Sequence, residues 1–511
     1  MTSLQKSDPV ATYVGGRDQK MLIGGKFVGS SDGAIIAAID PSTNKQIAEV
    51  PSASSKDIAA AVSAAEAAQP GWEALGIGGR SKCFQRFAEL VQENRERLAM
   101  LDAIDCGNPV QAMRTDIDIC APYLDGWPAL AKALTGDVIP ASPGNLHYTS
   151  HRPYGVVGRI TAFNHPAMFA ITRPLPSLIT GNTLVMKPSE ETSLSMLALG
   201  ELFHEAFPPG VVNIVTGGAA AGDAMVTHRD VKRLAFTGSV RTGLVIQRRA
   251  AESGYVKHVS LELGGKNAMV VFPDVDVDLA VDGAIFGMNL NVCQGQACGS
   301  NSRILVHSKI YDDFVNRIAD RISRYRVGIA YDDATDVGPL VSKAHWNRVM
   351  SYVESGVSEG ATLVRGGERP SNAPSAGNFV EPALFADVKP EMRIGREEIF
   401  GPVISVFRWD DYDQMLAEAN GLDLGLTASV WTNDLNIAHK TADALNAGYV
   451  WINDSTRHYF GTPFGGMKNS SLGREESKDE LLTYVEHKVI HTRLGDGKAA
   501  FERYLNGVGQ R

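Results

Sequence analysis

Features that would place the chain in a special class are scarce among its 511 residues. No apolar run approaches the roughly 18 residues needed to cross a bilayer. The first 20 residues are polar and lack the apolar core of a signal peptide. Lysine and arginine (49) are fewer than aspartate and glutamate (58), so the basic footprint of a nucleic-acid-binding protein is missing. We therefore expect a cytoplasmic protein with no nucleic-acid and no membrane partner.

Cysteine is also scarce, and the five residues are irregularly spaced, which does not describe a disulfide framework. Cys83, Cys106 and Cys120 fall in or after helical patterns, where a buried and inert thiol is expected. Cys293 and Cys298 lie in a polar, Gly-rich stretch. A zinc site at these two is not expected, because no Cys or His cluster supplies further ligands, and the sequence predicts no metal.

What is present is an ordinary globular composition, with 44% hydrophobic and 21% charged residues. A chain of this length exceeds one compact core, so we expect two or three domains. A strand pair is expected at 21–28, turning on Gly24-Gly25, and an Ala-rich helix at 55–68 with Ser55 as its N-cap. Helical periodicity continues over 80–104.

From Gly155 onward, apolar runs alternate with amphipathic segments, which predicts βαβ units and doubly wound parallel sheets. Strands of a first sheet are expected at 156–163, 183–186, 211–215, 233–236 and 259–261, with helices beginning near Pro166, Ser193, Ala220 and Ser239. Strands of a second sheet are expected at 268–272, 303–306, 361–365, 404–407 and 429–431, with helices at 276–288 and 312–325. Ligands of such sheets bind beyond the carboxyl ends of the strands.

Two isolated strands, at 146–153 and 482–491, need partners because an exposed strand edge is prone to aggregation. Pairing with each other, and with another subunit, would satisfy both edges. We therefore expect a homo-oligomer, either a homodimer or a homotetramer.

The stretch 260–303 holds a carboxylate and a thiol that can act together. Glu262 ends an apolar run, so partial burial should raise its pKa, which suits a general base. Cys298 has flanks too polar for an ordinary core strand, which favours a nucleophile over a structural thiol. Cys293 has similar flanks and remains a rival nucleophile.

Four other segments end predicted strands with polar or Gly-rich residues, and each has a structural alternative. Asn164 can point amide donors into a cleft or can be a turn residue before proline. Lys187 and Glu190 suit ribose hydroxyls or phosphates, but Ser189 and Glu190 can also be a helix cap and a first-turn acid.

The other two segments carry a Gly turn and an aromatic residue. The turn at 236–243 can bring backbone N–H groups against a pyrophosphate, but it lacks the full Gly-x-Gly-x-x-Gly pattern and can be a plain βα turn. Glu398 and Phe400 can hold and stack a planar ligand or can belong to a solvated helix end.

Six motifs together resemble the aldehyde dehydrogenase superfamily, from about residue 22 to about residue 489. They are Leu-Glu-Leu-Gly-Gly-Lys at 261–266, Gly-Gln-x-Cys at 295–298 with Arg303 following, Glu-Ile-Phe-Gly-Pro at 398–402, Lys-Pro-Ser-Glu at 187–190, Phe-Thr-Gly-Ser at 236–239 and Pro-Phe-Gly-Gly-x-Lys at 463–468.

The resemblance implies an α/β fold with two doubly wound, Rossmann-like domains and a small β oligomerisation element. The implied divisions are a dinucleotide-binding domain at 1–135 and 154–262, a catalytic domain at 263–476, and oligomerisation strands with a C-terminal tail at 136–153 and 477–511.

The resemblance also implies residue roles. Cys298 would be the nucleophile, Glu262 the general base, and Asn164 a donor to the oxyanion. The implied cofactor is NAD, with NADP possible, because an acid at Glu190 repels a 2′-phosphate. The residues implied to contact it are Ile160, Thr161, Ala162, Phe163, Lys187, Ser189, Glu190, Gly217, Phe236, Gly238, Ser239, Thr242, Leu263, Glu398 and Phe400.

The implied reaction is oxidation of a small-molecule aldehyde to its carboxylic acid, through a cysteine thiohemiacetal and a thioester hydrolysed by a Glu262-activated water. Family members that acylate coenzyme A commonly lack an acid at this position. The alternatives are a semialdehyde dehydrogenase acting on a carboxylate-bearing or aromatic aldehyde, a CoA-acylating enzyme, a thiol esterase and a non-catalytic family member.

By position, the implied substrate pocket contains Met168, Phe169, Thr172, Ala297, Gly299, Arg457, His458 and Phe464. Arg457 and His458 can attract a substrate carboxylate or can face solvent.

The chain departs from the family pattern at several places. Phe163 stands where the family usually has Trp, and His165 replaces a common aromatic residue. The usual Ser-Gly-x-Gly-Arg-Glu reads Ser-Ser-Leu-Gly-Arg-Glu at 470–475. The interval from Glu262 to Cys298 is about two residues longer than usual, and the extra residues fall within 289–294.

Overall fold

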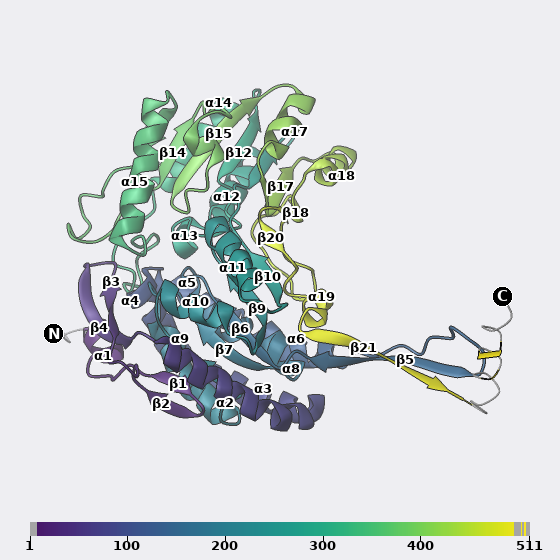
Figure 1. Cartoon of the computed structure of the whole chain (residues 1–511). Coiled ribbons are helices and arrows are strands. Elements are labelled where there is room, and N and C mark those ends of the chain that lie inside the picture. The colour runs from purple at the N-terminus through teal and green to yellow at the C-terminus, as the bar shows by residue number, and fades with distance from the viewer. Residues whose placement is uncertain (1–7, 495–501, 503–504, 507–511) are drawn as a thin grey trace.

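The computed structural model describes residues 8–494, 502 and 505–506, and it confirms the α/β class (Figure 1). Two sheet-and-helix units lie one above the other in Figure 1, and a two-stranded ribbon projects away from them. Within the described residues, no helix is both long and apolar enough to cross a membrane.

The first sheet has eight strands, and its five central strands are parallel to one another. Their spatial order is β2 (Lys26–Val28), β1 (Met21–Ile23), β8 (Val212–Ile214), β7 (Thr183–Lys187), β6 (Val156–Ile160), β9 (Val231–Thr237), β10 (His258–Glu262) and β20 (Ser471–Leu472). The predicted strands of this sheet are therefore confirmed, with shifts of a few residues at their ends.

Helices cover both faces of the first sheet because side chains alternate along each strand. In β7, Leu184 and Met186 enter the core beneath one set of helices, and Val185 enters the opposite core. One set is α2 (Ser55–Ala74), α10 (Ala219–Thr227) and α11 (Val240–Glu252). The other is α3 (Gly76–Glu93), α4 (Arg95–Cys106), α6 (Ala121–Ala131), α7 (Pro166–Thr172), α8 (Leu175–Ile179) and α9 (Leu194–Ala206).

The second sheet has seven strands, all parallel except the first, which pairs antiparallel with its neighbour. The order is β13 (Thr362–Arg365), β14 (Ala383–Ala386), β15 (Val403–Trp409), β12 (Arg303–His307), β11 (Ala268–Val271), β17 (Thr427–Trp431) and β18 (Tyr449–Ile452). The helices of this unit are α12 (Val277–Gly287), α13 (Leu290–Cys293), α14 (Tyr311–Ile322), α15 (Lys343–Ser358), α16 (Arg393–Arg396), α17 (Tyr412–Asn420) and α18 (Leu435–Ala444).

The projecting ribbon consists of β5 (Asn145–Pro153) and β21 (Val485–Arg493), so the predicted pairing of the two isolated strands is confirmed. Its pairing with another subunit stays a prediction, as do the domain boundaries. The smaller elements are α1 (Pro9–Tyr13), β3 (Ile35–Asp40), β4 (Lys45–Pro51), α5 (Val110–Asp118), β16 (Leu424–Gly425), β19 (Met467–Lys468) and α19 (Lys478–Leu482).

Three local expectations need correction. The N-cap of α2 is Ser54 rather than Ser55, because Ser54 and Asp57 form a reciprocal capping box. The same helix extends beyond residue 68 to Ala74 and includes Pro70. The periodicity over 80–104 belongs to two helices, which are separated at Asn94.

Candidate active site

A cavity of about 530 Å³ lies beyond the carboxyl ends of the parallel strands of the first sheet. Loops that follow β6, β7, β8, β9 and β10 line it, and residues of the second unit close its other side. This is the place where open parallel sheets bind ligands.

Most of the predicted site residues share this cavity. Those that line it are Ile160, Thr161, Ala162, Phe163, Asn164, Phe169, Lys187, Ser189, Glu190, Phe236, Gly238, Ser239, Thr242, Glu262, Leu263, Cys298, Glu398 and Phe400. Those that do not line it are Met168, Thr172, Gly217, Ala297, Gly299, Arg457, His458 and Phe464.

Cys298 is half-buried and follows a tight turn after α13. Gly295 permits this turn, because its φ is +71° and an added Cβ would overlap the Gly401 carbonyl. Asn267, which precedes β11, donates from its Nδ2 to the Cys298 carbonyl (2.7 Å) and to the Ser300 carbonyl (2.9 Å). The backbone of the thiol is therefore fixed to the second sheet.

The thiol of Cys298 stays protonated at neutral pH in this environment. Burial raises its pKa to about 12, and the Glu398 and Glu262 carboxyl groups add to the shift. A shift in this direction disfavours the free thiolate at neutral pH.

Glu262 is the last residue of β10 and is 6% exposed. Its Oε1 accepts a hydrogen bond from Ser471 Oγ (2.8 Å), because β10 pairs with β20 in a register that places the two residues opposite each other. Its Oε2 is buried and has no protein partner. Burial, followed by repulsion from Glu475, raises the pKa of Glu262 well above its usual range, which suits a general base.

Asn164 lies in the loop after β6 and is 3% exposed. Its backbone carbonyl accepts a hydrogen bond from Asn108 Nδ2 (2.8 Å), and the preceding Phe163 carbonyl accepts from Cys106 Sγ (3.2 Å). These contacts fix the loop that carries the candidate oxyanion donor.

Lys187 lines the cavity and is held by backbone carbonyls. Its Nζ donates to the carbonyls of Pro188 (2.7 Å) and Gly217 (2.6 Å) and lies 3.7 Å from the Glu190 carboxylate. Gly217 therefore contributes a carbonyl to Lys187 rather than surface to the cavity. Burial lowers the pKa of Lys187, and Glu190 opposes that shift.

The start of α11 also lines the cavity. Ser239 caps this helix by accepting a hydrogen bond from the Thr242 N–H (3.2 Å). Gly238 precedes the cap, and an added Cβ there would overlap the Phe236 ring. The positive end of the α11 dipole therefore borders the cavity, as an anion such as a pyrophosphate requires.

Glu398 and Phe400 line the cavity from the second unit. Glu398 Oε1 accepts from the Gly265 N–H (3.0 Å), and burial raises the pKa of Glu398 to about 7. Phe400 has a φ of +59° and its ring packs edge-on against Phe163, with centroids 5.5 Å apart. This backbone conformation is rare for a residue other than glycine and is typical of functional sites.

Sequence reasoning missed two side chains that hold the backbone at Glu398 and Phe400. His345 Nε2 donates to the Phe400 carbonyl (2.6 Å), and Arg348 donates to the Glu398 carbonyl (2.8 Å). Both belong to α15 and line the cavity. They carry no local signal because their partners are about fifty positions away in the chain.

Two predicted substrate residues, Arg457 and His458, lie near carboxylates of the protein itself. The Arg457 side chain is 63% exposed and lies 3.8 Å from Asp454. His458 Nδ1 lies 3.2 Å from Glu476. Burial acts to raise the pKa of Glu476, but the charges of His458 and Arg173 lower it to about 2. His458 thus faces a protein carboxylate, which leaves it a poor anchor for a substrate carboxylate.

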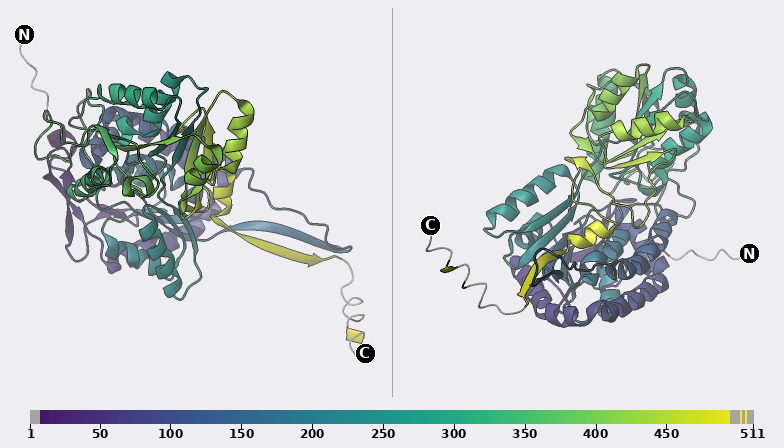
Figure 2. Two further views of the ribbon diagram at one scale, coloured as in Figure 1. Left: turned by 90° about the horizontal axis from the view of Figure 1, so that it is seen from above. Right: turned by 90° about the vertical axis from the view of Figure 1, so that its right-hand side faces the viewer.

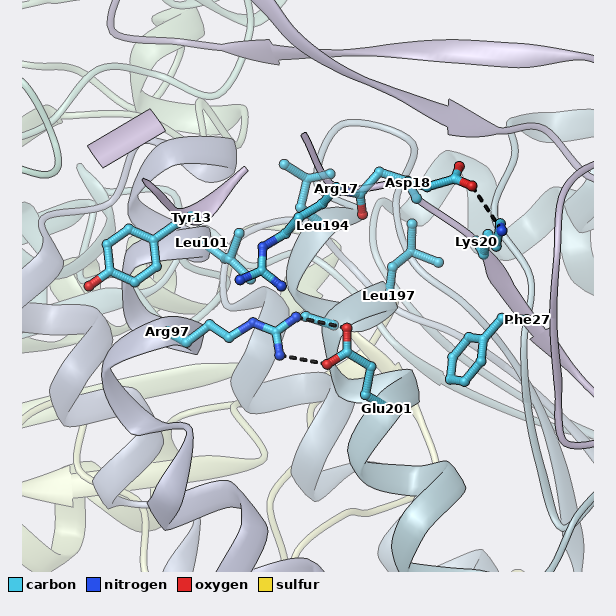
Figure 3. Close-up of a pocket in the computed structure, with 12 residues that line it drawn as sticks. Tyr13, Arg17, Asp18, Lys20, Phe27, Arg97, Leu101, Leu194, Leu197 and Glu201 are labelled. Carbon is cyan, nitrogen blue, oxygen red and sulfur yellow. Dashed lines mark hydrogen bonds and ion pairs between the residues drawn. The ribbon is translucent and has the colours of Figure 1, made fainter. Parts of the chain in front are cut away.

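A second pocket, of about 280 Å³, lies near α1 and contains none of the predicted site residues (Figure 3). Four of its charged side chains form two ion pairs. Arg97 donates to both oxygens of Glu201 (2.7 and 2.9 Å), and Lys20 lies 2.8 Å from Asp18. The chemistry that the sequence predicts therefore belongs to the larger cavity.

The family profile described as "Aldehyde dehydrogenase family" matches residues 27–490. "Aldehyde dehydrogenase tropH" of Talaromyces stipitatus is 41% identical over 480 residues, which cover 92% of both chains. The "Betaine aldehyde dehydrogenase" of Rhizobium etli is 39% identical and covers 94% of this chain and 98% of its own length.

The fold agrees with solved structures of such proteins. The NAD⁺ complex of an aldehyde dehydrogenase from Bacillus cereus superposes with a TM-score of 0.91, at 39% identity, over 95% of this chain and 98% of that one. The fold, the cavity and the sequence motifs therefore agree with the family match. The chain belongs to the aldehyde dehydrogenase family.

Proposed function

We propose that the protein oxidises an aldehyde to its carboxylic acid with NAD as the hydride acceptor. The observation that carries this proposal is one cavity with two kinds of surface. Cys298, Glu262 and Asn164 line it together with Lys187, Glu190 and the start of α11. The NAD⁺ complex of the Bacillus cereus relative supports the choice of cofactor.

The residues present fit a dinucleotide. Lys187 and Glu190 would hold the adenine-side ribose, the backbone N–H groups around Ser239 would face the pyrophosphate, and Glu398 would hold the nicotinamide ribose. The carboxylate of Glu190 is half-exposed at the cavity, where it disfavours a 2′-phosphate. When bound, the cofactor accepts a hydride from the carbon atom attached to Cys298.

The first half of the reaction uses Cys298 and Asn164. The Cys298 thiol loses its proton to water, the thiolate attacks the aldehyde carbon, the carbonyl oxygen becomes an oxyanion, and a thiohemiacetal forms on Cys298. The Asn164 amide and the Cys298 N–H donate to that oxygen; one such donor is worth about 3 kcal/mol in the transition state. Loss of hydride from this adduct leaves a thioester.

The second half uses Glu262. Its unpartnered Oε2 takes a proton from water, and the hydroxide attacks the thioester carbon. The carbon–sulfur bond breaks, the acid leaves and the Cys298 thiol is restored. Ser471 holds the other carboxyl oxygen at 2.8 Å, so the base keeps one orientation.

A panel of aliphatic, aromatic, amino-bearing and carboxylated aldehydes tests the proposal, with NADH absorbance at 340 nm as the readout. NADH and free acid should form with at least one aldehyde when no coenzyme A is present. Product that appeared only as an acyl-CoA would overturn hydrolysis. Ester cleavage without NADH would favour a thiol esterase, and inertness with every aldehyde would favour a non-catalytic member of the family.

A further inference from the structure

A residue of the short strand β20 lies against the proposed general base. The strand pairs antiparallel with β10, and in this register Ser471 is directly opposite Glu262. The Leu263 N–H donates to the Ser470 carbonyl (2.9 Å), which joins the two segments immediately beside this pair. The C-terminal part of the chain, drawn in yellow, thus runs back from the second unit to the first sheet (Figures 1 and 2).

The hydroxyl of Ser471 has two acceptors within reach and one hydrogen atom to donate. Its Oγ lies 2.8 Å from Glu262 Oε1 and 3.0 Å from the Gly473 carbonyl oxygen. A hydroxyl donates one hydrogen bond and accepts up to two. When the hydrogen atom turns to Gly473, Oγ can accept a hydrogen bond from a protonated Oε1. The contact with Glu262 therefore persists whether the carboxyl group is ionised or protonated.

The two oxygens of the Glu262 carboxyl group have different surroundings. A Cβ added to Gly465 would lie 2.9 Å from Oε1, so the backbone packs closely against the oxygen that Ser471 contacts. Oε2 is buried and has no hydrogen-bond partner among the described residues. Because Glu262 lines the cavity, Ser471 holds one oxygen and leaves the other for water.

The groups around Glu262 act in opposite directions on its ionisation. Burial, followed by the Glu475 carboxylate, raises the pKa of Glu262. The serine hydrogen bond lowers this pKa because it favours the charged form, and the charges of Arg173 and Arg474 act in the same direction. Cys298, the other titratable group beside Glu262, is uncharged at neutral pH because its pKa is raised to about 12.

We propose that Ser471 is a positioning residue that keeps the Glu262 carboxyl group available as a base near neutral pH, an inference that rests on the proposed function. The hydroxyl donates to Oε1 of the carboxylate, and it accepts from Oε1 of the protonated form while its own hydrogen atom turns to the Gly473 carbonyl. Ser471 takes no part in bond making. Glycine, which usually occupies this position of the family motif, has no hydroxyl to offer.

Removal of the hydroxyl should shift the pH range in which the base works. Ser471→Ala would leave the buried Oε1 of Glu262 without this donor, so the carboxylate would become less favourable relative to the acid. A hydrogen bond to a charged group is worth about tenfold or more in such an equilibrium. Thioester hydrolysis at neutral pH should slow by about tenfold, and its pH midpoint should rise by about one unit.

The first test measures the lifetime of the acyl group on Cys298. Excess enzyme with NAD reacts once with an aldehyde that gives NADH, and samples are quenched with acid at intervals and weighed by mass spectrometry, at several values between pH 6 and pH 9. Ser471→Ala should keep the NADH burst and prolong the lifetime of the acyl-enzyme. Ser471→Thr retains a hydroxyl and should restore hydrolysis.

Ser260→Ala is the matched control. Ser260 lies on β10 two positions before Glu262, so its side chain is on the same face of the strand. Its hydroxyl accepts from Arg233 (2.8 Å) rather than contacting the base. Loss of this hydroxyl should leave the lifetime of the acyl-enzyme and its pH midpoint unchanged.

The second test needs no substrate. Infrared difference spectra between the protein and its Glu262→Gln variant follow the protonated carboxyl band of Glu262 as the pH changes. The midpoint should rise in Ser471→Ala and return in Ser471→Thr. A purely structural role for Ser471 would lower the melting temperature without moving this midpoint.

Three results would overturn the inference. They are an unchanged infrared midpoint in Ser471→Ala, an equal shift in Ser260→Ala, and a Ser471→Thr variant that is folded but behaves like Ser471→Ala. If Ser471→Ala has an altered circular dichroism spectrum, Ser471→Gly takes its place in both tests. Wild-type protein that formed neither NADH nor an acyl adduct would contradict the proposed function instead, and the infrared midpoint would still test the contact.

Discussion

Cys293 and Cys298 are five positions apart in similar sequence, yet the fold gives them different surroundings. Cys298 is half-buried and lines the cavity. Cys293 is fully buried at the end of α13, near the His165 side chain. Two consecutive residues with positive φ, Gln294 and Gly295, turn the chain between them. The fold thus leaves Cys298, and not Cys293, on the surface of the cavity, a difference that their similar flanking residues do not show.

The largest expected effect separates the two thiols. Cys298→Ala should lower the rate of NADH formation by about 10³-fold or more, because the covalent route is lost. Cys293→Ala should retain the NADH burst, because this thiol does not line the cavity. Stopped-flow absorbance at 340 nm measures both. The assignment would be reversed if Cys293→Ala, and not Cys298→Ala, abolished the burst.

Replacement of Glu262, the proposed general base, should distinguish acylation of Cys298 from hydrolysis of the thioester. Glu262→Gln should keep the first NADH burst while steady-state turnover falls by about 10²- to 10⁴-fold, because the thioester is no longer hydrolysed. Burst amplitude and steady-state rate are compared in one experiment. Equal loss of both would show that Glu262 acts before the thioester forms.

Asn164→Ala tests whether the oxyanion forms beside Cys298. The acylation rate should fall by about 10²- to 10³-fold, since one oxyanion donor is removed. The Kd for NAD, measured by fluorescence quenching, should stay unchanged because the oxyanion forms only in the transition state. A larger change in NAD affinity than in rate would place Asn164 at the nucleotide instead.

The pH dependence of acylation depends on the burial of Cys298. Because its pKa is raised to about 12, the thiolate fraction grows about tenfold for each unit of rising pH below that value. Burst rates should therefore rise from pH 6 to pH 9. A rate that was flat over this interval would show that the thiol loses its proton before the aldehyde binds.

The smallest effect concerns Cys293 itself. Asp116 Oδ2 lies 2.6 Å from His165 Nδ1, and His165 in turn contacts the buried thiol. Burial acts to lower the pKa of His165, but the Asp116 carboxylate raises it well above its usual range. Cys293→Ala should therefore cost about 1–2 kcal/mol of stability with activity within twofold. Thermal unfolding and kcat are the two measurements.

Local signals in the sequence predicted most of the strands and a set of candidate site residues that the fold brings together around one cavity. Glu262 could be placed because it ends an apolar strand, and Cys298 because Gly and polar residues surround it. The Gly turn before α11 was found for the same reason, since a turn between a strand and a helix is encoded within a few residues.

Contacts between distant segments could not be predicted. Ser471 reaches Glu262 across 209 positions, through a two-residue strand that has no periodicity to detect. Ser471 departs from the family pattern, and yet its hydroxyl donates to the Glu262 carboxylate. The sequence left His458 open between the substrate pocket and a solvent-facing loop, because its pairing with Glu476 depends on tertiary structure.

Direct observation of the covalent adduct tests the central claim that Cys298 is the nucleophile. Glu262→Gln is mixed with aldehyde and NAD, quenched with acid and analysed by tandem mass spectrometry of the peptide spanning 267–303, which contains both thiols. We predict an acyl group on Cys298 and an unmodified Cys293. An acyl group on Cys293, or no adduct despite a full burst of NADH, would contradict that claim.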